Sequence, residues 1–115
     1  MVVRQLIYEK KFSKALKVLQ TAVSKDPVNA DIYNLLGFTS RNLDKNKIAG
    51  RYYAKALQLN PEHLGALEYQ GELFIKLKNM NKAKENLARL KALCGVNCEE
   101  YLDLRADIEK ATRKK

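Results

Sequence analysis

Two cysteines near the carboxyl end of the chain are the residues best suited to covalent or metal chemistry. Cys94 and Cys98 bracket the segment CGVNC. A disulfide requires the turn to bring their Cα atoms within about 7 Å of each other. A structural metal site needs about four ligands, and a thioredoxin-type redox motif has two residues between its cysteines rather than three. The only histidine, His63, is far away in the sequence. We therefore expect no metal and no cofactor, which leaves a disulfide or two free, packed thiols.

Acid–base chemistry has few other candidates in this chain. Glu68 and Glu72 are four residues apart, so they share one face of a helix and could act as a general acid and base. Polar residues that line a binding surface account for the same spacing. His63 follows Pro61 closely, and we expect it at the surface of a first helical turn. The sequence has no Gly-rich phosphate loop and no zinc-protease motif, so it predicts a protein that is not an enzyme.

The elements that position these residues are predicted to be helices. The chain has 115 residues, with 46% hydrophobic and 30% charged residues, which is an ordinary globular composition. Its 5 Gly and 2 Pro are too few for the many turns of a β-sandwich. The sequence contains no run of 18 apolar residues, so it predicts no transmembrane helix. The net charge of +9 favours anionic partners but does not bear on the fold.

A repeat of 34 residues organises the chain. Pro27 and Pro61 are 34 positions apart, and aligning them places KALKVLQTAVSKDP on IAGRYYAKALQLNP. Small and bulky residues then coincide at fixed places. The matched pairs are Ala15 with Ala49, Leu19 with Tyr53, Ala22 with Ala56, Gly37 with Gly71, Ala49 with Ala83, and Tyr33 with Leu67.

This pattern resembles the tetratricopeptide-repeat (TPR) family, whose 34-residue motif has an aromatic, Leu, Gly and Tyr in one helix and Ala, an aromatic, Ala and Pro in the next. The second repeat supplies nearly the whole motif, with Ser40 in place of the usual Tyr. It contains Tyr33, Leu36, Gly37, Ala49, Tyr53, Ala56 and Pro61. The third repeat supplies Leu67, Gly71, Phe74, Ala83 and Leu87, but has Gln70 and Gly95 where Leu and Pro are usual.

The resemblance implies an all-α, right-handed solenoid of antiparallel helix pairs in which each pair buries its apolar face against its neighbours. We expect a single domain over residues 1–115, with a partial repeat at 1–29, repeats at 30–63 and 64–95, and a capping helix at 97–113. Asn97 is the expected N-cap of that last helix. The helices are expected at 2–9, 13–25, 29–42, 47–59, 63–77, 81–93 and 98–113.

The first repeat lacks its front half by this register. Either the chain is a fragment or processed form, or a short helix caps the stack. We expect a cytoplasmic protein if Met1 is the true start and a periplasmic one if an export signal has been removed. An open first repeat would also expose a helix face on which a second copy could stack, so self-association is a further expectation.

The resemblance implies a function in protein binding. In TPR domains the first helix of each pair lines a concave groove that holds a partner peptide or helix. By register, the groove residues here are Tyr8, Asn34, Phe38, Arg41, Asn42, Glu68, Tyr69, Glu72 and Lys76. The alternative is that Phe38 and Tyr69 pack between repeats.

One kind of TPR ligand is disfavoured. Chaperone-binding TPR domains hold a terminal carboxylate with a clamp of Lys, Asn and Arg. The corresponding positions of this chain carry Leu35, Gly65 and Tyr69, with Arg4 in the first repeat. We therefore do not expect recognition of a chaperone C-terminus.

A different class of function is suggested by lysines in the second helix of each pair. Examples are Lys14 and Lys17, Lys47 and Arg51, and Lys84 and Arg89. By resemblance these helices form the convex face, which could bind nucleic acid or anionic lipid through phosphate contacts. The alternative is an ordinary solvated surface that keeps the protein soluble.

The tail LARLKALCGVNCEEYLDL resembles that of small bacterial TPR proteins, often exported, which carry two cysteines at this spacing. That resemblance favours the disulfide between Cys94 and Cys98 over free thiols.

Overall fold

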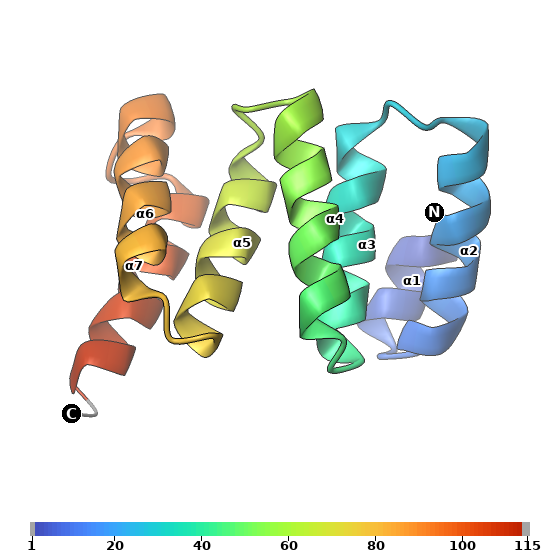
Figure 1. Ribbon diagram of the computed structural model, residues 1–115, viewed down its shortest axis with the longest axis horizontal. Coiled ribbons are helices and arrows are strands. Elements are labelled where there is room, and N and C mark those ends of the chain that lie inside the picture. Colours follow the sequence, from blue (N-terminus) through green and yellow to red (C-terminus); the bar gives the residue numbers. More distant parts are fainter. Residues whose placement is uncertain (1, 114–115) are drawn as a thin grey trace. The chain divides into compact units, whose positions relative to one another are not determined.

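The computed structural model describes residues 2–113, which form seven α-helices and no strand (Figure 1). The helices are α1 (Val2–Tyr8), α2 (Phe12–Lys25), α3 (Ala30–Asn42), α4 (Asn46–Leu59), α5 (Leu64–Lys76), α6 (Met80–Cys94) and α7 (Glu99–Arg113). The prediction of an all-α chain is confirmed, and each predicted boundary is within one residue of the observed one. None of the described helices combines the length and apolar character needed to cross a membrane.

The helix starts repeat with the predicted period. α3 and α5 begin at residues 30 and 64, and α2, α4 and α6 begin at residues 12, 46 and 80. Prolines set two of the ends, because the residue before a proline avoids the helical region. Asp26 and Asn60, which precede Pro27 and Pro61, have extended φ values of −143° and −144°.

Side chains cap the starts of three helices. The Oδ1 atoms of Asn29 and Asn79 accept N–H bonds from Ile32 and Lys82. His63 was expected in the first turn of a helix, but it is instead the N-cap of α5, where its Nδ1 accepts the N–H of Ala66 at 3.0 Å. The prediction of Asn97 as the N-cap of the last helix was wrong by one residue. α7 begins at Glu99, so Cys98 takes the position before it.

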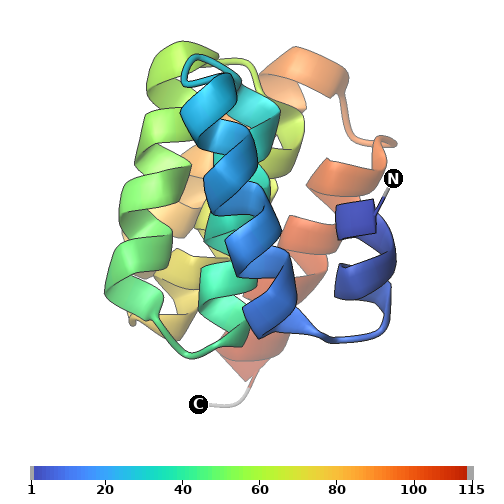
Figure 2. The same ribbon diagram turned by 90° about the vertical axis from the view of Figure 1, so that its right-hand side faces the viewer.

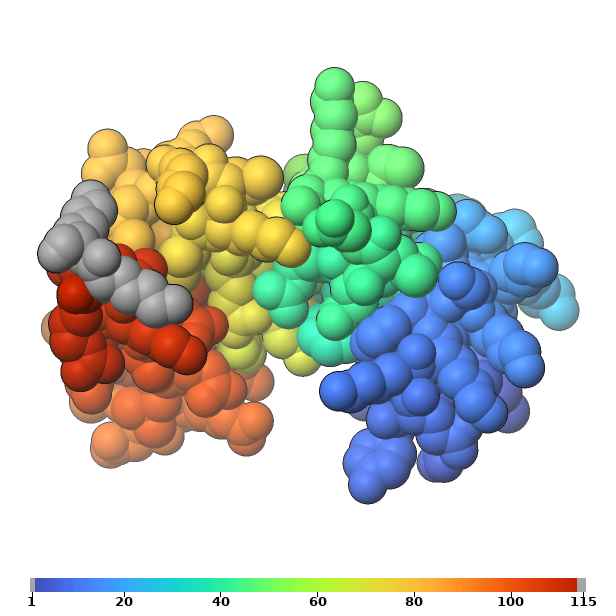
Figure 3. All heavy atoms as spheres, turned by 90° about the horizontal axis from the view of Figure 1, so that it is seen from below, coloured from blue at the N-terminus to red at the C-terminus, as the bar shows by residue number. Residues whose placement is uncertain are grey.

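The chain divides into two compact units, whose described residues are 2–61 (α1–α4) and 62–113 (α5–α7). The first unit is built around α3, which packs against both α2 and α4. Its core contains Val3, Ala15, Leu19 and Leu36, joined by Ala49, Tyr53 and Ala56. α1 runs beside α2 but is much shorter (Figure 2). The turns 9–11 and 43–45 of this unit face the viewer in Figure 3, in blue and green.

A glycine allows the close approach of α3 and α4. A Cβ atom on Gly37 would lie only 2.5 Å from Cε1 of Tyr53. Tyr53 is fully buried, so its ring has no free space into which to move. The motif glycine of this repeat therefore admits a large aromatic ring from the paired helix.

In the second unit, α7 packs against both α5 and α6. The predicted apolar stripe of this helix is confirmed, because Tyr101, Leu104 and Ile108 are all buried. A Cβ atom on Gly71 would lie 2.6 Å from Cδ2 of Leu104. Here the motif glycine admits a side chain of the final helix.

Candidate partner-binding surfaces

The predicted groove residues divide into two sets, one in each unit. In the first unit, α3 carries four of them within about two turns. Asn34 is buried, Phe38 and Arg41 are half-buried, and Asn42 is exposed. Asn42 turns back onto its own helix, where its Nδ2 donates to the carbonyl oxygen of Phe38 at 2.8 Å. These residues recur at a spacing of three or four, so the sequence places them on one helix face.

Phe38 is the centre of this set. The rings of Phe38 and Phe12 form an edge-type pair with centroids 6.4 Å apart, and the guanidinium of Arg41 lies 5.8 Å from the centroid of the Phe38 ring. Phe38 therefore makes a packing contact with Phe12, and its role in a groove stays a prediction. One side of the ring packs within the unit, while the residue remains half-exposed.

Asn34 and Tyr8 differ sharply in exposure. Asn34 is 7% exposed, and its Oδ1 has no hydrogen-bond partner among the described residues. Tyr8 ends α1 and is 84% exposed. Tyr8 is accessible, whereas the Asn34 side chain is held inside the protein, where an unsatisfied acceptor is costly.

In the second unit, the predicted residues lie on α5. Glu68 is buried, Tyr69 and Glu72 are half-buried, and Lys76 is exposed. Burial raises the pKa of Glu68 to about 9, helped by a hydrogen bond to Glu72 and by the negative charge of Glu72. At neutral pH Glu68 is therefore protonated and donates that hydrogen bond. These two carboxyl groups form a polar pair that shares one proton, and nothing else about them indicates catalysis.

Two acidic residues near Glu68 were not among the predicted groove residues. Asp103 and Glu100 of α7 are near enough to add to the raised pKa of Glu68. The acidic start of the last helix was visible in the sequence, and the 34-residue register could have revealed the link. Residue 103 is 34 positions after Tyr69, so α7 continues the series of first helices.

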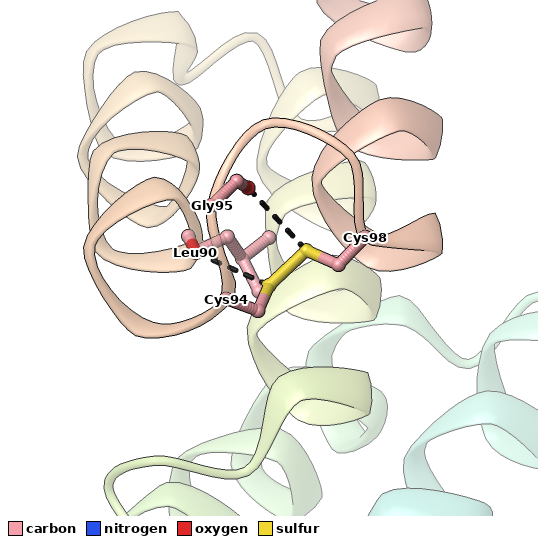
Figure 4. The surroundings of a disulfide bond; sticks show 4 residues. All are labelled: Leu90, Cys94, Gly95 and Cys98. Carbon is pink, nitrogen blue, oxygen red and sulfur yellow. Dashed lines mark hydrogen bonds between the residues drawn. A yellow bond between two sulfur atoms is a disulfide. The ribbon is translucent and has the colours of Figure 1, made fainter.

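The cysteines lie where α6 passes into α7 (Figure 4). Their sulfur atoms are joined in a disulfide and their Cα atoms are 5.9 Å apart, which is within the range that disulfides allow. Gly95, between them, has a positive φ of 81°, which glycine adopts without strain. The nearby carboxylate of Glu100 lies within 4.8 Å of both sulfur atoms.

Known proteins resemble this chain in sequence and in fold. Residues 30–63 match the model of the tetratricopeptide repeat. A curated relative, "Uncharacterized protein ycf37" of Pyropia yezoensis, is 30% identical over 87 residues, or 68% of this chain. The chain spans about half of that relative's length, 49%.

Two solved structures show the same fold. The first TPR domain of Spaghetti (RPAP3), bound to the HSP90 peptide SRMEEVD, has a TM-score of 0.85 and 19% identity, with 97% of this chain and 86% of that chain covered. The type III secretion chaperone SycD of Yersinia enterocolitica, in complex with a peptide of the translocator YopD, has a TM-score of 0.82 and 15% identity, covering 98% and 88%. The fold is a TPR-type helical solenoid, and with the matched repeat it follows that this chain is a tetratricopeptide-repeat protein.

Proposed function

We propose that this protein is a non-catalytic interaction module, and that it binds a partner peptide or helix through the groove-position residues of α3 and α5. The observation that carries the proposal is the environment of Phe38. Its half-exposed ring is held by Phe12 and lies beside the guanidinium of Arg41. A pre-positioned aromatic next to a cation offers contact area at a small cost in side-chain entropy. The structurally similar domains of RPAP3 and SycD are seen with bound peptides, which supports this class of function.

The two surfaces suit different parts of a partner. The α3 surface offers an aromatic ring and the Arg41 guanidinium, which suit apolar and acidic groups. The α5 surface offers the half-buried side chains of Tyr69 and Glu72, and the carboxylate of Glu72 suits hydrogen-bond donors or a cation. A basic residue of a partner suits Glu72 of α5. The positions of the carboxylate clamp carry Leu35, Gly65 and Tyr69, which disfavours a terminal carboxylate as the ligand.

His63 supports a non-catalytic role. Its Nδ1 is engaged as the helix cap of α5, so the single histidine of the chain has a structural explanation. The proton-sharing pair of Glu68 and Glu72 is explained by burial of one carboxyl beside the other. Neither feature requires a reaction.

An affinity capture experiment tests the proposal. Wild-type protein is compared with the double variant Phe38→Ala/Tyr69→Ala after nuclease treatment, and captured proteins are identified by mass spectrometry. We expect one protein to be captured by wild type and lost by the variant, with circular dichroism confirming that the variant is folded. Phe74→Leu is the matched control, because Phe74 is an aromatic of α5 that lies beside Lys82 instead. Equal capture by wild type and the double variant would overturn the proposal.

A second candidate function is polyanion binding, which the exposure of the second-helix lysines favours. Lys14, Lys17, Lys47, Lys84 and Lys91 are all exposed. Binding of nucleic acid or anionic lipid through many such contacts should fall by roughly a thousandfold or more between 50 and 200 mM salt. Binding that depends on Phe38 should weaken little over the same range. Salt titration of any captured complex therefore separates the two functions.

Self-association is a third proposal, because the apolar residues Val2 of α1 and Val18 of α2 are exposed. Light scattering at two protein concentrations tests it directly. A molar mass that rises with concentration would indicate stacking between copies, and a constant mass of about one chain would exclude it.

A further inference from the structure

The turn between α6 and α7 brings together three groups of the kinds that bind metal ions. The Sγ atoms of Cys94 and Cys98 and a carboxylate oxygen of Glu100 all lie within 4.8 Å of one another. The three residues are half-buried. The sequence offers two cysteines and a distant histidine as ligands, so no metal was expected. Glu100, in the first turn of α7, adds a third ligand beside the two sulfur atoms.

The spacing of this group suits a single metal ion once the disulfide is reduced. Thiolates bind Zn²⁺ at about 2.3 Å and carboxylate oxygens at about 2.0–2.2 Å, so ligand atoms around one tetrahedral ion are roughly 3.5–3.8 Å apart. The Cα atoms of the two cysteines are 5.9 Å apart. Rotation about their Cα–Cβ bonds, between staggered positions, can therefore direct both sulfur atoms at one ion without moving either helix.

The charges near this turn also favour a cation. Glu100 and Asp103 of α7 are close enough to Glu68 for their negative charges to add to its raised pKa, so carboxyl groups of α5 and α7 are gathered beside the turn. Two thiolates next to these carboxyl groups would repel them. A divalent cation held by the thiolates offsets that repulsion.

We propose that Cys94, Cys98 and Glu100 form a redox-controlled site for Zn²⁺ in this protein. A dithiol reductant supplies two electrons and two protons, which convert the disulfide into two thiols, while the reductant becomes a disulfide. Zn²⁺ then displaces both thiol protons and binds the two thiolates and the Glu100 carboxylate. Three protein ligands leave the fourth tetrahedral position open to water.

The two states of the site have the same structural effect. The disulfide ties the end of α6 to the start of α7, as Figure 4 shows, and the ion would tie the same two points. Disulfides are rare in reducing compartments, where the metal-bound form would preserve this junction. The inference goes beyond the interaction function and does not depend on it.

Titration with Co²⁺, a coloured substitute for Zn²⁺, tests the site. The protein is reduced with a phosphine, freed of the reductant without exposure to air, and titrated. We expect a thiolate-to-cobalt charge-transfer band and the intense visible bands of tetrahedral cobalt, saturating at one ion per chain and disappearing when Zn²⁺ is added. The oxidised protein and Cys94→Ser/Cys98→Ser should give neither band.

A second variant tests the carboxylate. Glu100→Gln removes the charge of the third ligand and should weaken Co²⁺ binding roughly tenfold or more, since even changes to groups behind the ligands cost that much. Glu99→Gln is the matched control, because Glu99 is an exposed acidic neighbour outside the three-residue group. Circular dichroism of both variants checks that they are folded.

Three results would overturn the inference. The first is the absence of a charge-transfer band in reduced wild-type protein. The second is saturation at one ion per two chains, which would place the ion between copies. The third is equal affinity of Glu100→Gln and Glu99→Gln, which would leave two ligands and no built site.

Discussion

The helix pairs α3/α4 and α5/α6 share one register but fill the space beside their motif glycine from different directions. At Gly37 the neighbour is Tyr53, which comes from the second helix of the same pair. At Gly71 the nearest atoms belong to Leu104, which comes from the following helix, α7. The residue at the place of Tyr53 in the second pair is the smaller Leu87. The motif specifies a gap, and the tertiary structure determines which side chain fills it.

A second difference lies one position earlier on the second helix of each pair. In the first unit, Tyr52 packs near Tyr33. In the second unit, the corresponding residues are Asn86 and Leu67, and the Nδ2 of Asn86 donates to the carbonyl oxygen of Leu67 at 3.0 Å and to Gln70 Oε1 at 2.8 Å. One pair is stabilised by aromatic packing, the other by a buried polar network that requires correct geometry.

The largest expected effect comes from adding a methyl group at each motif glycine. Gly37→Ala should lower the free energy of unfolding by about 2–3 kcal/mol, because the Tyr53 ring is rigid and fully enclosed. Gly71→Ala should cost less, about 1 kcal/mol, because the side chain of Leu104, although also fully buried, has rotatable bonds that let its methyl groups shift, whereas the ring of Tyr53 is rigid. Urea unfolding of both variants measures the difference. Adding Tyr53→Leu to Gly37→Ala should restore part of the lost free energy of unfolding. An equal loss at both glycines would show that Tyr53 is no more rigid an obstacle than Leu104.

Reduction of the disulfide should affect the second unit alone. The bond closes a loop of five residues, so chain entropy assigns it roughly 2 kcal/mol of stability. Hydrogen exchange with and without a phosphine reductant should show faster exchange in α6 and α7 and no change in α2 or α3. The double variant Cys94→Ser/Cys98→Ser is the control, since the reductant should not alter it. Alkylation of both cysteines in unreduced, folded protein would show that the thiols are free.

Removing the polar network should destabilise the second unit. Asn86→Ala leaves Gln70 and the second lone pair of the Leu67 carbonyl without their buried donor, at a cost of about 1–2 kcal/mol. Thermal unfolding measures the loss. Asn81→Ala is the matched control, because Asn81 is an exposed residue of the same helix, and a similar loss in both variants would argue against the network.

The buried acid of α5 should make stability depend on pH. An unfolded chain releases the Glu68 proton near pH 4.5, whereas the folded protein keeps it up to about pH 9. The folded state therefore binds more protons between these values, and stability falls as the pH rises through that window. Wild-type protein should lose at least about 1.4 kcal/mol of its free energy of unfolding between pH 4 and pH 8, the equivalent of one pKa unit. Glu68→Gln should not show this loss.

Denaturant unfolding at pH 4, 6 and 8 checks this prediction. Glu85→Gln is the control, because Glu85 is exposed on α6. If the Glu68→Gln and wild-type profiles run parallel from pH 4 to pH 8, Glu68 does not keep its proton in the folded state.

The smallest expected effect is at the turns between paired helices. Lys78 and Asp44 occupy the same turn position and have positive φ values of 66° and 63°. Lys78→Gly should stabilise the protein by about 1 kcal/mol, since glycine removes the steric strain of this conformation. Asp44→Gly should gain less, because aspartate tolerates it better. Melting temperatures measure both gains, with Lys78→Ala as a control that should show none.

Most of the helical architecture could be predicted from the sequence. The two Asp/Asn–Pro steps and the 34-residue spacing of small residues locate the helices within a residue. The start of α7 was misplaced by one position because Asn97 is a good N-cap by type, while the actual start depends on the turn that carries Cys94, Gly95 and Cys98. The role of His63 was missed because histidine is an uncommon cap.

The candidate surfaces were less predictable. Register placed Asn34 and Glu68 in the groove set, but both side chains are buried, which no single-helix argument reveals. The contribution of α7 to the acidic surface depends on how that helix packs against α5, so it involves contacts distant in sequence. Burial and the neighbouring Glu72 raise the pKa of Glu68 most, and Asp103 and Glu100 of α7 add to that shift.

The sequence by itself determined the helices and their repeat, because capping, proline geometry and the spacing of small and apolar residues act over a few positions. Only the tertiary structure decided that Tyr53 fills one glycine gap and Leu104 the other. It also decided that Glu68 keeps its proton in the folded state. Each of these depends on which side chains meet across helices, and on the water excluded there, rather than on any local preference of the chain.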